Sequence, residues 1–321
     1  MPTIAIRLRP AVLNLIGNTP LIPLKFPEDG VTVFAKAEYL NPTGSIKDRF
    51  ARYVLEEAVR SGKLREDSTI LECTSGNTGI SLAMVGAALG YRVRILMSDT
   101  ASVERRYLIQ QFGAEVQLFT ATRGYGTGID LSLEMAARDS RLFLPRQFEN
   151  PLNTQDHEEE TGPEILSQMS GRVDAFVAGY GTGGTLTGCA RALRRANPAT
   201  RIYAMEPAEA AMLSGEAPCC HLIEGIAGGY LPPLLNGSRF DGIIKVSSAD
   251  AIAMTRRLTR EFGLLVGTSS GANVVAAVRI ALEIGPKARV ATILCDRAER
   301  YYSTKLFAHA EPAFAKAAAA A

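Results

Sequence analysis

The sequence predicts an α/β fold with two doubly wound, mostly parallel-sheet domains. Short apolar segments alternate with helix-like segments along most of the chain, which is the pattern of parallel strands joined by helices. Polar, glycine-rich turns repeatedly separate an apolar strand from the helix that follows it. The chain has 321 residues, which is long for one hydrophobic core and suits two domains of roughly 150 residues each.

In the first half of the chain, a short helix, a turn and a strand are predicted within residues 12–24. Further strands are predicted at residues 31–38, 69–73, 92–97, 116–119 and 141–144. Helices are predicted between these strands, at residues 45–61, 80–89, 103–112 and 129–139. Gly90 and Gly113 follow two of the helices, as glycine commonly does at a helix C-terminus.

The same alternation continues in the second half, where strands are predicted at residues 175–178, 201–206, 264–266 and 290–295. Helices are predicted at residues 160–169, 185–196, 249–262 and 272–284, with an irregular insertion at 209–224. We expect a smaller domain at residues 40–148 and a larger domain made of residues 1–39 and 149–307. The alanine-rich run at 308–321 has no patterned face and is expected to be a disordered tail.

The composition is that of an ordinary globular protein that binds a small molecule. Hydrophobic residues make up 47% of the chain and charged residues 21%, and the net charge of +2 creates no electrostatic demand for nucleic acid or an anionic membrane. No apolar run approaches the ~18 residues of a membrane span, and the N-terminus lacks the pattern of a signal peptide. No metal site is expected. The five cysteines lack C-x-x-C spacing and are interpreted as reduced thiols, which favours a cytoplasmic location.

The segment Asn41-Pro-Thr-Gly-Ser-Ile-Lys47-Asp-Arg49 places a lysine in the first turn of a predicted helix, with Ser45 as the expected N-cap. The positive end of the helix dipole disfavours a cation there. Partial burial would lower the pKa of the ammonium group further. Both effects favour a neutral amine that can form a Schiff base. A solvated surface lysine is the alternative, so the other loops must decide between them.

The loop Gly179-Tyr-Gly-Thr-Gly-Gly184 matches G-x-G-x-x-G between a predicted strand and a predicted helix, and Glu206 lies at the end of the next strand. This pattern is typical of dinucleotide-binding oxidoreductases, in which the helix start binds pyrophosphate and the carboxylate binds ribose. The loop also contains Gly181-Thr-Gly-Gly-Thr185, whose backbone N–H groups and two hydroxyls suit one phosphate monoester. A purely structural glycine-rich turn is the third interpretation.

Two further polar loops lie between a strand and a helix. Thr74-Ser-Gly-Asn-Thr78 presents hydroxyls, backbone N–H groups and the Asn77 amide, which suit a carboxylate or another anionic oxygen. In Gly267-Thr-Ser-Ser-Gly271, the loop taken alone favours a serine that caps the following helix over a binding role. Such loops can converge on one ligand, because α/β proteins bind ligands at the carboxyl edge of their parallel strands.

Together, N-P-T-G-S-I-K-D-R, T-S-G-N-T-G, G-T-G-G-T and G-T-S-S-G resemble the motifs of the cysteine synthase and cystathionine β-synthase catalytic-core family, which are fold-type II pyridoxal phosphate enzymes. The motifs occur in the family's order at compatible separations, and the resemblance runs from about Val12 to Phe307. It implies pyridoxal 5'-phosphate in a cleft between the two domains, of which the smaller closes over the substrate. It also implies a homodimer, with serine acetyltransferase as a possible partner.

The resemblance further implies a role for each matching residue. Lys47 would hold the cofactor as a Schiff base and act as the catalytic base, Asn77 would bind the ring hydroxyl, and Ser269 would face the pyridine nitrogen. The cofactor phosphate would be bound by Gly181, Thr182, Gly183, Gly184 and Thr185. The substrate would be bound by Thr74, Ser75, Gly76, Thr78, Gln147, Gly225 and Gly228.

The implied activity is β-replacement of O-acetyl-L-serine with sulfide, which gives L-cysteine and acetate. The segment from Gly225 to Tyr230 lies in a stretch without arginine or lysine, which favours a neutral acetyl ester over O-phosphoserine. An O-phosphoserine-dependent sulfhydrylase and a cystathionine β-synthase remain alternatives within the family. Four arginines from other loops could still reach the site: Arg123, Arg146, Arg297 and Arg300. Two departures from the family's usual residues, at Cys73 and at Cys295-Asp-Arg-Ala-Glu-Arg300, leave rate and specificity open.

Overall fold

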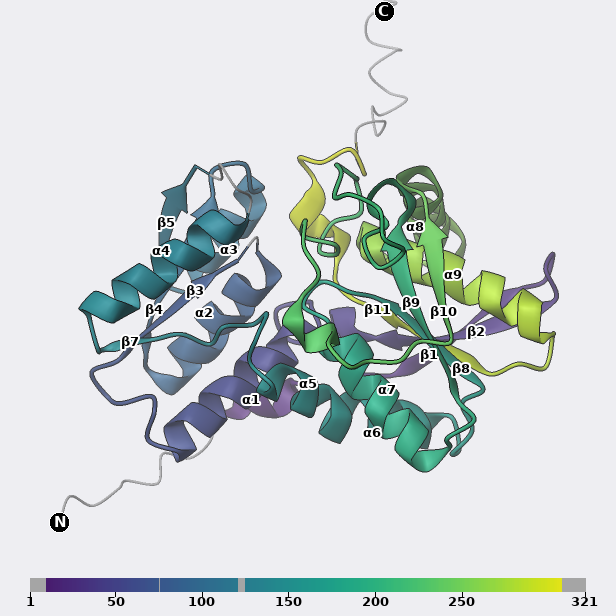
Figure 1. Cartoon of the computed structure of the whole chain (residues 1–321), viewed down its shortest axis with the longest axis horizontal. Helices are drawn as coiled ribbons and strands as arrows, with labels where there is room; N and C mark the ends of the chain where they lie inside the picture. Colours follow the sequence, from purple (N-terminus) through teal and green to yellow (C-terminus); the bar gives the residue numbers. More distant parts are fainter. Residues whose placement is uncertain (1–9, 75, 121–124, 308–321) are drawn as a thin grey trace, which may run out of the picture.

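The computed structural model describes residues 10–74, 76–120 and 125–307, so the predicted tail at 308–321 lies outside the described residues. Two separate sheets organise this part of the chain (Figure 1). The larger sheet has the order β1-β2-β11-β8-β9-β10, and the smaller one has the order β5-β4-β3-β7. The predicted α/β class with mostly parallel sheets is confirmed.

The larger sheet joins strands from both ends of the chain. Its strands are β1 (Leu21–Phe26), β2 (Val31–Ala37), β8 (Ala175–Gly179), β9 (Arg201–Pro207), β10 (Gly242–Val246) and β11 (Val290–Leu294). Strands β1 and β2 pair antiparallel, and every other neighbouring pair in this sheet is parallel. The antiparallel pair is possible because a short turn connects β1 directly to β2.

The smaller sheet uses one continuous part of the chain and is parallel throughout. Its strands are β3 (Thr69–Cys73), β4 (Arg92–Ser98), β5 (Glu115–Phe119) and β7 (Leu142–Phe143). The helices that connect these strands are α2 (Asn77–Leu89), α3 (Val103–Gln111) and α4 (Tyr125–Arg138), which lie beside this sheet in Figure 1. Each crossover therefore brings the chain back to begin the next parallel strand at the same edge.

The remaining helices surround the larger sheet or lie between the two sheets (Figure 1). They are α1 (Lys47–Arg60), α5 (Leu152–Asp156), α6 (Gly162–Gln168), α7 (Gly184–Ala196), α8 (Ser248–Phe262) and α9 (Thr268–Ile284). A π-helical turn, His157–Thr161, joins α5 to α6. No helix in the described ranges is long and apolar enough to cross a membrane.

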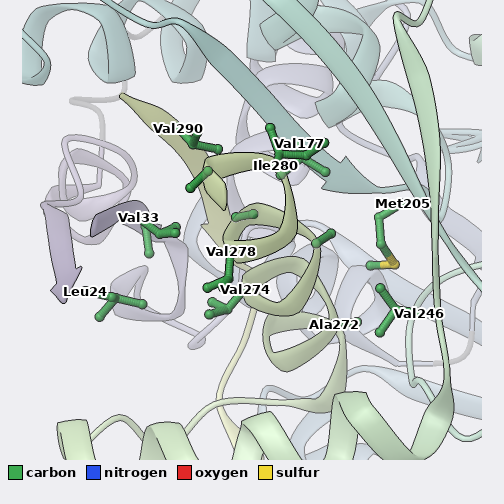
Figure 2. Close-up of a cluster of buried hydrophobic side chains, with 14 of the residues drawn as sticks. Leu24, Val33, Val177, Met205, Val246, Ala272, Val274, Val278, Ile280 and Val290 are labelled. Carbon is green, nitrogen blue, oxygen red and sulfur yellow. The ribbon is translucent and has the colours of Figure 1, made fainter. Parts of the chain in front are cut away.

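The main core of the larger unit forms where α9 packs on the sheet (Figure 2). Val274 and Val278 of this helix lie with Val33, Val177 and Val290 of three neighbouring strands, and all five side chains are buried. Alanine and glycine on α9 let its other side approach α8 closely. A Cβ on Gly271 would lie 2.4 Å from a backbone oxygen of α8, so only glycine fits there. This packing fixes the start of α9, where Ser269 lies.

The structure corrects three expected boundaries. The strand β10 was not predicted, and the strand predicted at residues 264–266 is wrong, because Val266 makes only an isolated bridge to Arg297. The first long helix begins at Lys47 rather than at Ser45. The N-cap is Ile46 rather than Ser45, whose Oγ accepts a hydrogen bond of 3.3 Å from the Lys47 backbone N–H.

Candidate active site

A cavity of about 590 Å³ lies where strands of both sheets end. Its walls come from the loops after β3, β8 and β11 and from the starts of α1, α2 and α9. Twelve predicted site residues line it, namely Lys47, Thr74, Asn77, Thr78, Gln147, Gly181, Thr182, Gly183, Thr185, Gly225, Gly228 and Ser269. Gly76 and Gly184 are not among the lining residues, and Ser75 lies outside the described residues.

Lys47 is the first residue of α1, and its half-buried side chain lines the cavity. Burial lowers the pKa of its ammonium group, although Cys295, Asp296 and Asp156 oppose this by favouring the charged form. Its ammonium makes no hydrogen bond or ion pair with any side chain in the described part of the chain. A lysine with a lowered pKa and an uncommitted nitrogen is suited to act as a nucleophile and a base.

Asp48, which follows Lys47 in the sequence, stabilises the turn that precedes Lys47. This buried carboxylate accepts hydrogen bonds from the Thr43 backbone N–H at 2.7 Å and from Ser81 Oγ of α2 at 2.5 Å. Burial raises the pKa of Asp48, and these donors oppose the rise. The contacts tie the start of α1 to α2, so the position of Lys47 is set by two elements of the fold.

Arg49 fixes the other side of the same helical turn. Its guanidinium lies 2.7 Å from carboxylate oxygens of both Glu38 and Glu164, which belong to elements around the larger sheet. Arg49 and Glu38 are fully buried, and removing one partner from such a pair is strongly destabilising. Arg49 therefore links the first turn of α1 to the elements around the larger sheet, and Asp48 links the same turn to α2.

The loop after β8 has the geometry of a phosphate-binding cup. Gly183 adopts a φ of +86°, and its carbonyl oxygen accepts the first hydrogen bond of α7 from Thr187 at 3.0 Å. The N–H groups ahead of that bond have no helical acceptor and point out of the helix start. A Cβ at Gly181 would lie 2.6 Å from the Gly225 carbonyl oxygen, and a Cβ at Gly184 would lie 2.3 Å from Asn153 Oδ1. These glycines are required by close packing, which explains why Gly184 lies behind the cavity wall.

Side chains outside the loop orient the two threonine hydroxyls of the cup. Asn153 Nδ2 donates to Thr182 Oγ1 at 2.9 Å, and Thr185 Oγ1 lies 3.1 Å from His157 Nε2. His157 is in the π-helical turn, and burial lowers its pKa well below the usual range, with Arg49 and Lys47 adding to the effect. The imidazole is therefore neutral. The donor set of N–H groups and hydroxyls fits a phosphate monoester.

The loop after β3 faces the cup from the smaller sheet. Thr78 Oγ1 donates to Gln147 Oε1 at 2.5 Å, and Gln147 Nε2 donates to the Cys73 carbonyl oxygen at 3.3 Å. The Gln147 backbone N–H donates to Glu72, and burial raises the pKa of that carboxyl group to about 8. These bonds fix Thr78 and Gln147 at the start of α2, where backbone N–H groups without a helical acceptor suit a carboxylate ligand.

Ser269 and Ser270 have different surroundings although they are adjacent. Ser269 lines the cavity at the start of α9. Ser270 is fully buried, and its Oγ accepts a hydrogen bond from the Cys295 backbone N–H at 2.8 Å. The structure therefore places Ser269 at the cavity wall and gives Ser270 a structural contact.

Glu206 does not face the cavity, which argues against the dinucleotide interpretation. Its fully buried carboxylate accepts hydrogen bonds from Tyr180 Oη, from the backbone N–H groups of Leu213 and Ser214, and from Ser214 Oγ. These donors hold the insertion after β9. A carboxylate committed in this way is not available to a ribose hydroxyl.

The sequence interpretation missed several residues that line the cavity, including Arg105, Glu224, Tyr301, Cys219, Cys220 and His221. Of the four arginines that we considered, Arg146, Arg297 and Arg300 are not lining residues, and Arg123 lies outside the described residues. Arg105 instead enters from the first turn of α3, which follows β4. The sequence could have indicated Arg105 as a site residue, because it lies at the start of a helix that follows a parallel strand.

The fold and this cavity define an α/β protein in which a lysine with a lowered pKa lies beside a loop suited to a phosphate group. The profile of the family described as "Pyridoxal-phosphate dependent enzyme" matches residues 12–296. The chain belongs to this family. Its cofactor is pyridoxal phosphate, whose phosphate and aldehyde match the cup and the lysine of the cavity.

Three individual proteins show which members of the family this chain is similar to. A cysteine synthase of Staphylococcus aureus (strain Mu50 / ATCC 700699) is 43% identical over 299 residues, which cover 92% of this chain and 96% of the relative. The crystal structure of O-ureido-L-serine synthase has a TM-score of 0.90 and 42% identity, covering 97% of this chain and 98% of that one. The O-acetylserine-dependent cystathionine β-synthase from Helicobacter pylori has a TM-score of 0.88 and 36% identity, covering 92% and 98%.

Proposed function

We propose that this enzyme is a cysteine synthase, which replaces the acetate of O-acetyl-L-serine with sulfide to form L-cysteine. The observation that carries the proposal is that Lys47 lines one cavity together with residues of two polar loops. These residues are Thr74, Asn77 and Thr78 of the first loop and Gly181, Thr182, Gly183 and Thr185 of the second. The similarity to the cysteine synthase of Staphylococcus aureus supports it. The relative from Helicobacter pylori, whose name includes O-acetylserine, supports the choice of donor.

Each predicted site residue has a task in this reaction. The cup formed by Gly181, Thr182, Gly183 and Thr185 binds the cofactor phosphate, with Gly184 supporting the turn. Asn77 binds the ring hydroxyl and Ser269 faces the ring nitrogen. When bound, the cofactor supplies an electron-withdrawing ring that stabilises negative charge at the substrate Cα.

The substrate carboxylate is held by the loop of Thr74, Ser75, Gly76 and Thr78, with Gln147 beside it. Lys47 removes the Cα proton when the acetate leaves, and it returns a proton to Cα after sulfide has added at Cβ. Gly225 and Gly228 leave room for the acyl group. A neutral serine at the ring nitrogen moderates the electron demand of the ring, which favours replacement at Cβ over transamination.

Cysteine formation by the holoenzyme tests this proposal. Lys47→Ala should lose the visible absorption band of the lysine-bound cofactor and reduce turnover by at least about 10³-fold, within the range expected for a group that is both nucleophile and base. Lys63→Ala is the matched control, because Lys63 is exposed and lies in the loop after α1. Appreciable cysteine formation by Lys47→Ala would contradict the role of Lys47.

The identity of the nucleophile that adds at Cβ, the acceptor, is tested by comparing kcat/KM for sulfide, homocysteine and hydroxyurea. Sulfide is small and requires no recognition group, whereas homocysteine requires a second site for its carboxylate and amine. Hydroxyurea is included because its addition to the same Cβ would give an O-ureidoserine, the product named in a structural neighbour. A higher kcat/KM with either larger acceptor than with sulfide would replace the proposed activity with a different β-replacement.

We further propose that residues 40–148 form a smaller domain that closes over the substrate, and that residues 1–39 and 149–307 form the larger domain. We also propose that the protein is a cytoplasmic homodimer and that serine acetyltransferase is a binding partner. The net charge of +2 supports small-molecule substrates rather than nucleic acid or a membrane. Light scattering of the purified protein, alone and with the acetyltransferase, tests both associations.

A further inference from the structure

Arg105 and Glu224 form an ion pair inside the cavity. Arg105 Nη2 lies 2.8 Å from Glu224 Oε2, and both residues line the cavity wall. Arg105 belongs to α3 beside the smaller sheet, whereas Glu224 belongs to the insertion that follows β9 of the larger sheet. The guanidinium therefore reaches into the substrate region from one side and meets a carboxylate from the other.

Neighbouring groups hold both members of the pair in place. A Cβ on Gly76 would lie 2.1 Å from Arg105 Cδ, so the arginine side chain packs directly on the loop proposed to bind the substrate. The guanidinium carbon of Arg105 also lies 5.0 Å from the centre of the Tyr301 ring. The Glu224 backbone N–H donates to Thr268 Oγ1 at 2.9 Å. The side chain of Arg105 is only 8% exposed, compared with 34% for Glu224.

We propose that Glu224 keeps Arg105 from binding anionic donors and so makes the enzyme select O-acetylserine over O-phosphoserine. This inference rests on the proposed β-replacement activity. A neutral acetyl ester can enter while the ion pair stays intact. A phosphate dianion must either displace Glu224 from Arg105 or lie close to its negative charge. Selectivity against the phosphorylated donor thus comes from a paired arginine, and not from the lack of one.

The decisive variant is Glu224→Gln, which keeps the shape of the side chain and removes its charge. The ratio of kcat/KM for O-phosphoserine to kcat/KM for O-acetylserine should rise at least about tenfold, equivalent to about 1.4 kcal/mol. The ratio is the correct readout, because a change that affects the common α-carboxylate alters both donors equally. In Glu224→Gln combined with Arg105→Met, the gain should disappear.

The matched control is Glu115→Gln, since Glu115 forms an ion pair of 2.8 Å with Arg94 on the protein surface. It should leave the donor ratio unchanged. A second measurement does not depend on turnover of the phosphorylated donor. Inorganic phosphate, competing with O-acetylserine, should inhibit Glu224→Gln more strongly than wild type. In the holoenzyme the cofactor phosphate occupies the cup, so this inhibition reports on phosphate binding at Arg105.

Two results would overturn the inference: a donor ratio that does not change in Glu224→Gln, or a raised ratio that persists after Arg105→Met. Failure of the wild-type enzyme to form cysteine from O-acetylserine would instead refute the proposed function. If Glu224→Gln kept only part of its activity with O-acetylserine, stronger phosphate inhibition of that remaining activity would still support the inference, and unchanged inhibition would refute it.

Discussion

Asn77 Nδ2 donates a hydrogen bond of 2.5 Å to Asp296 Oδ2, which joins the start of α2 to the loop after β11. Arg300 Nη1 donates to Asn77 Oδ1, so both ends of the side-chain amide have assigned partners. The orientation of the amide is fixed because a guanidinium only donates and a carboxylate only accepts. The second hydrogen on Nδ2 is then left for a ligand in the cavity.

Removal of Asp296 should therefore weaken cofactor binding. In Asp296→Ala the Asn77 amide loses one of the two partners that orient it, and the dissociation constant for pyridoxal phosphate should increase about tenfold, or about 1.4 kcal/mol. Titration of the apoenzyme, followed by absorbance of the bound cofactor, measures this change. Asp67→Ala is the control, because Asp67 is 60% exposed on the surface. Equal affinities of Asp296→Ala and wild type would show that Asp296 does not orient Asn77 for the cofactor.

The two adjacent serines at the start of α9 should respond differently to substitution. Ser269→Asp should retain the cofactor but reduce kcat/KM at least about 100-fold, because a carboxylate at the ring nitrogen changes its protonation and the electron demand of the ring. Ser270→Ala should retain most activity and lose about 1 kcal/mol of stability, because it removes the acceptor of the partly buried Cys295 N–H. Steady-state kinetics and urea unfolding measure the two effects. Similar losses of activity at both positions would refute the assignment of Ser269.

Glu72 should make the stability of the protein depend on pH. Burial raises the pKa of Glu72 from 4.5 to about 8, so the folded protein keeps a proton that the unfolded chain releases between these values. The contribution of Glu72 to stability is fully present below pH 4.5 and is lost as the pH rises through about 8. Glu72→Gln has no such proton. Its free energy of unfolding, relative to wild type, should increase on the order of 3 kcal/mol between about pH 5 and pH 8.5.

Urea unfolding of wild type and Glu72→Gln at both pH values checks this expectation. Glu66→Gln serves as the control, because Glu66 is exposed in the loop before β3 and should show the pH dependence of wild type. If the curves of Glu72→Gln and wild type stayed parallel across this pH range, Glu72 would be ionised in the folded protein.

The sequence predicted those parts of the site that are encoded in consecutive residues. The loops at Thr74–Thr78 and Gly181–Thr185 are short, polar and placed between regular elements, so their position at strand ends followed from the pattern alone. Arg105 and Glu224 are 119 positions apart, and no local spacing indicates that they meet. Glu206 was ambiguous for a related reason, because the donors that occupy its carboxylate became known only from the folded insertion.

Some of the secondary structure was also decided by distant contacts. The segment of β10 follows an irregular insertion and becomes a strand by pairing with β9, whose residues precede it by about 40 positions. The segment at residues 264–266 has a similar apolar composition but meets no strand edge, so it forms only a bridge. Apolar pattern predicts burial well, whereas membership of a sheet depends on the partner that tertiary structure provides.

The pairing of β2 with β11 has a consequence for how the protein matures during synthesis. The register aligns Val33 with Val290, so an early strand completes its hydrogen bonds only after about 250 more residues have been made. At ~5 to 20 residues per second, translation of that interval takes roughly 13 to 50 s. The smaller sheet, encoded continuously between these strands, can form while the ribosome is still working. The nascent β1–β2 hairpin must meanwhile wait with an open edge, the state in which a chaperone would have the most to protect.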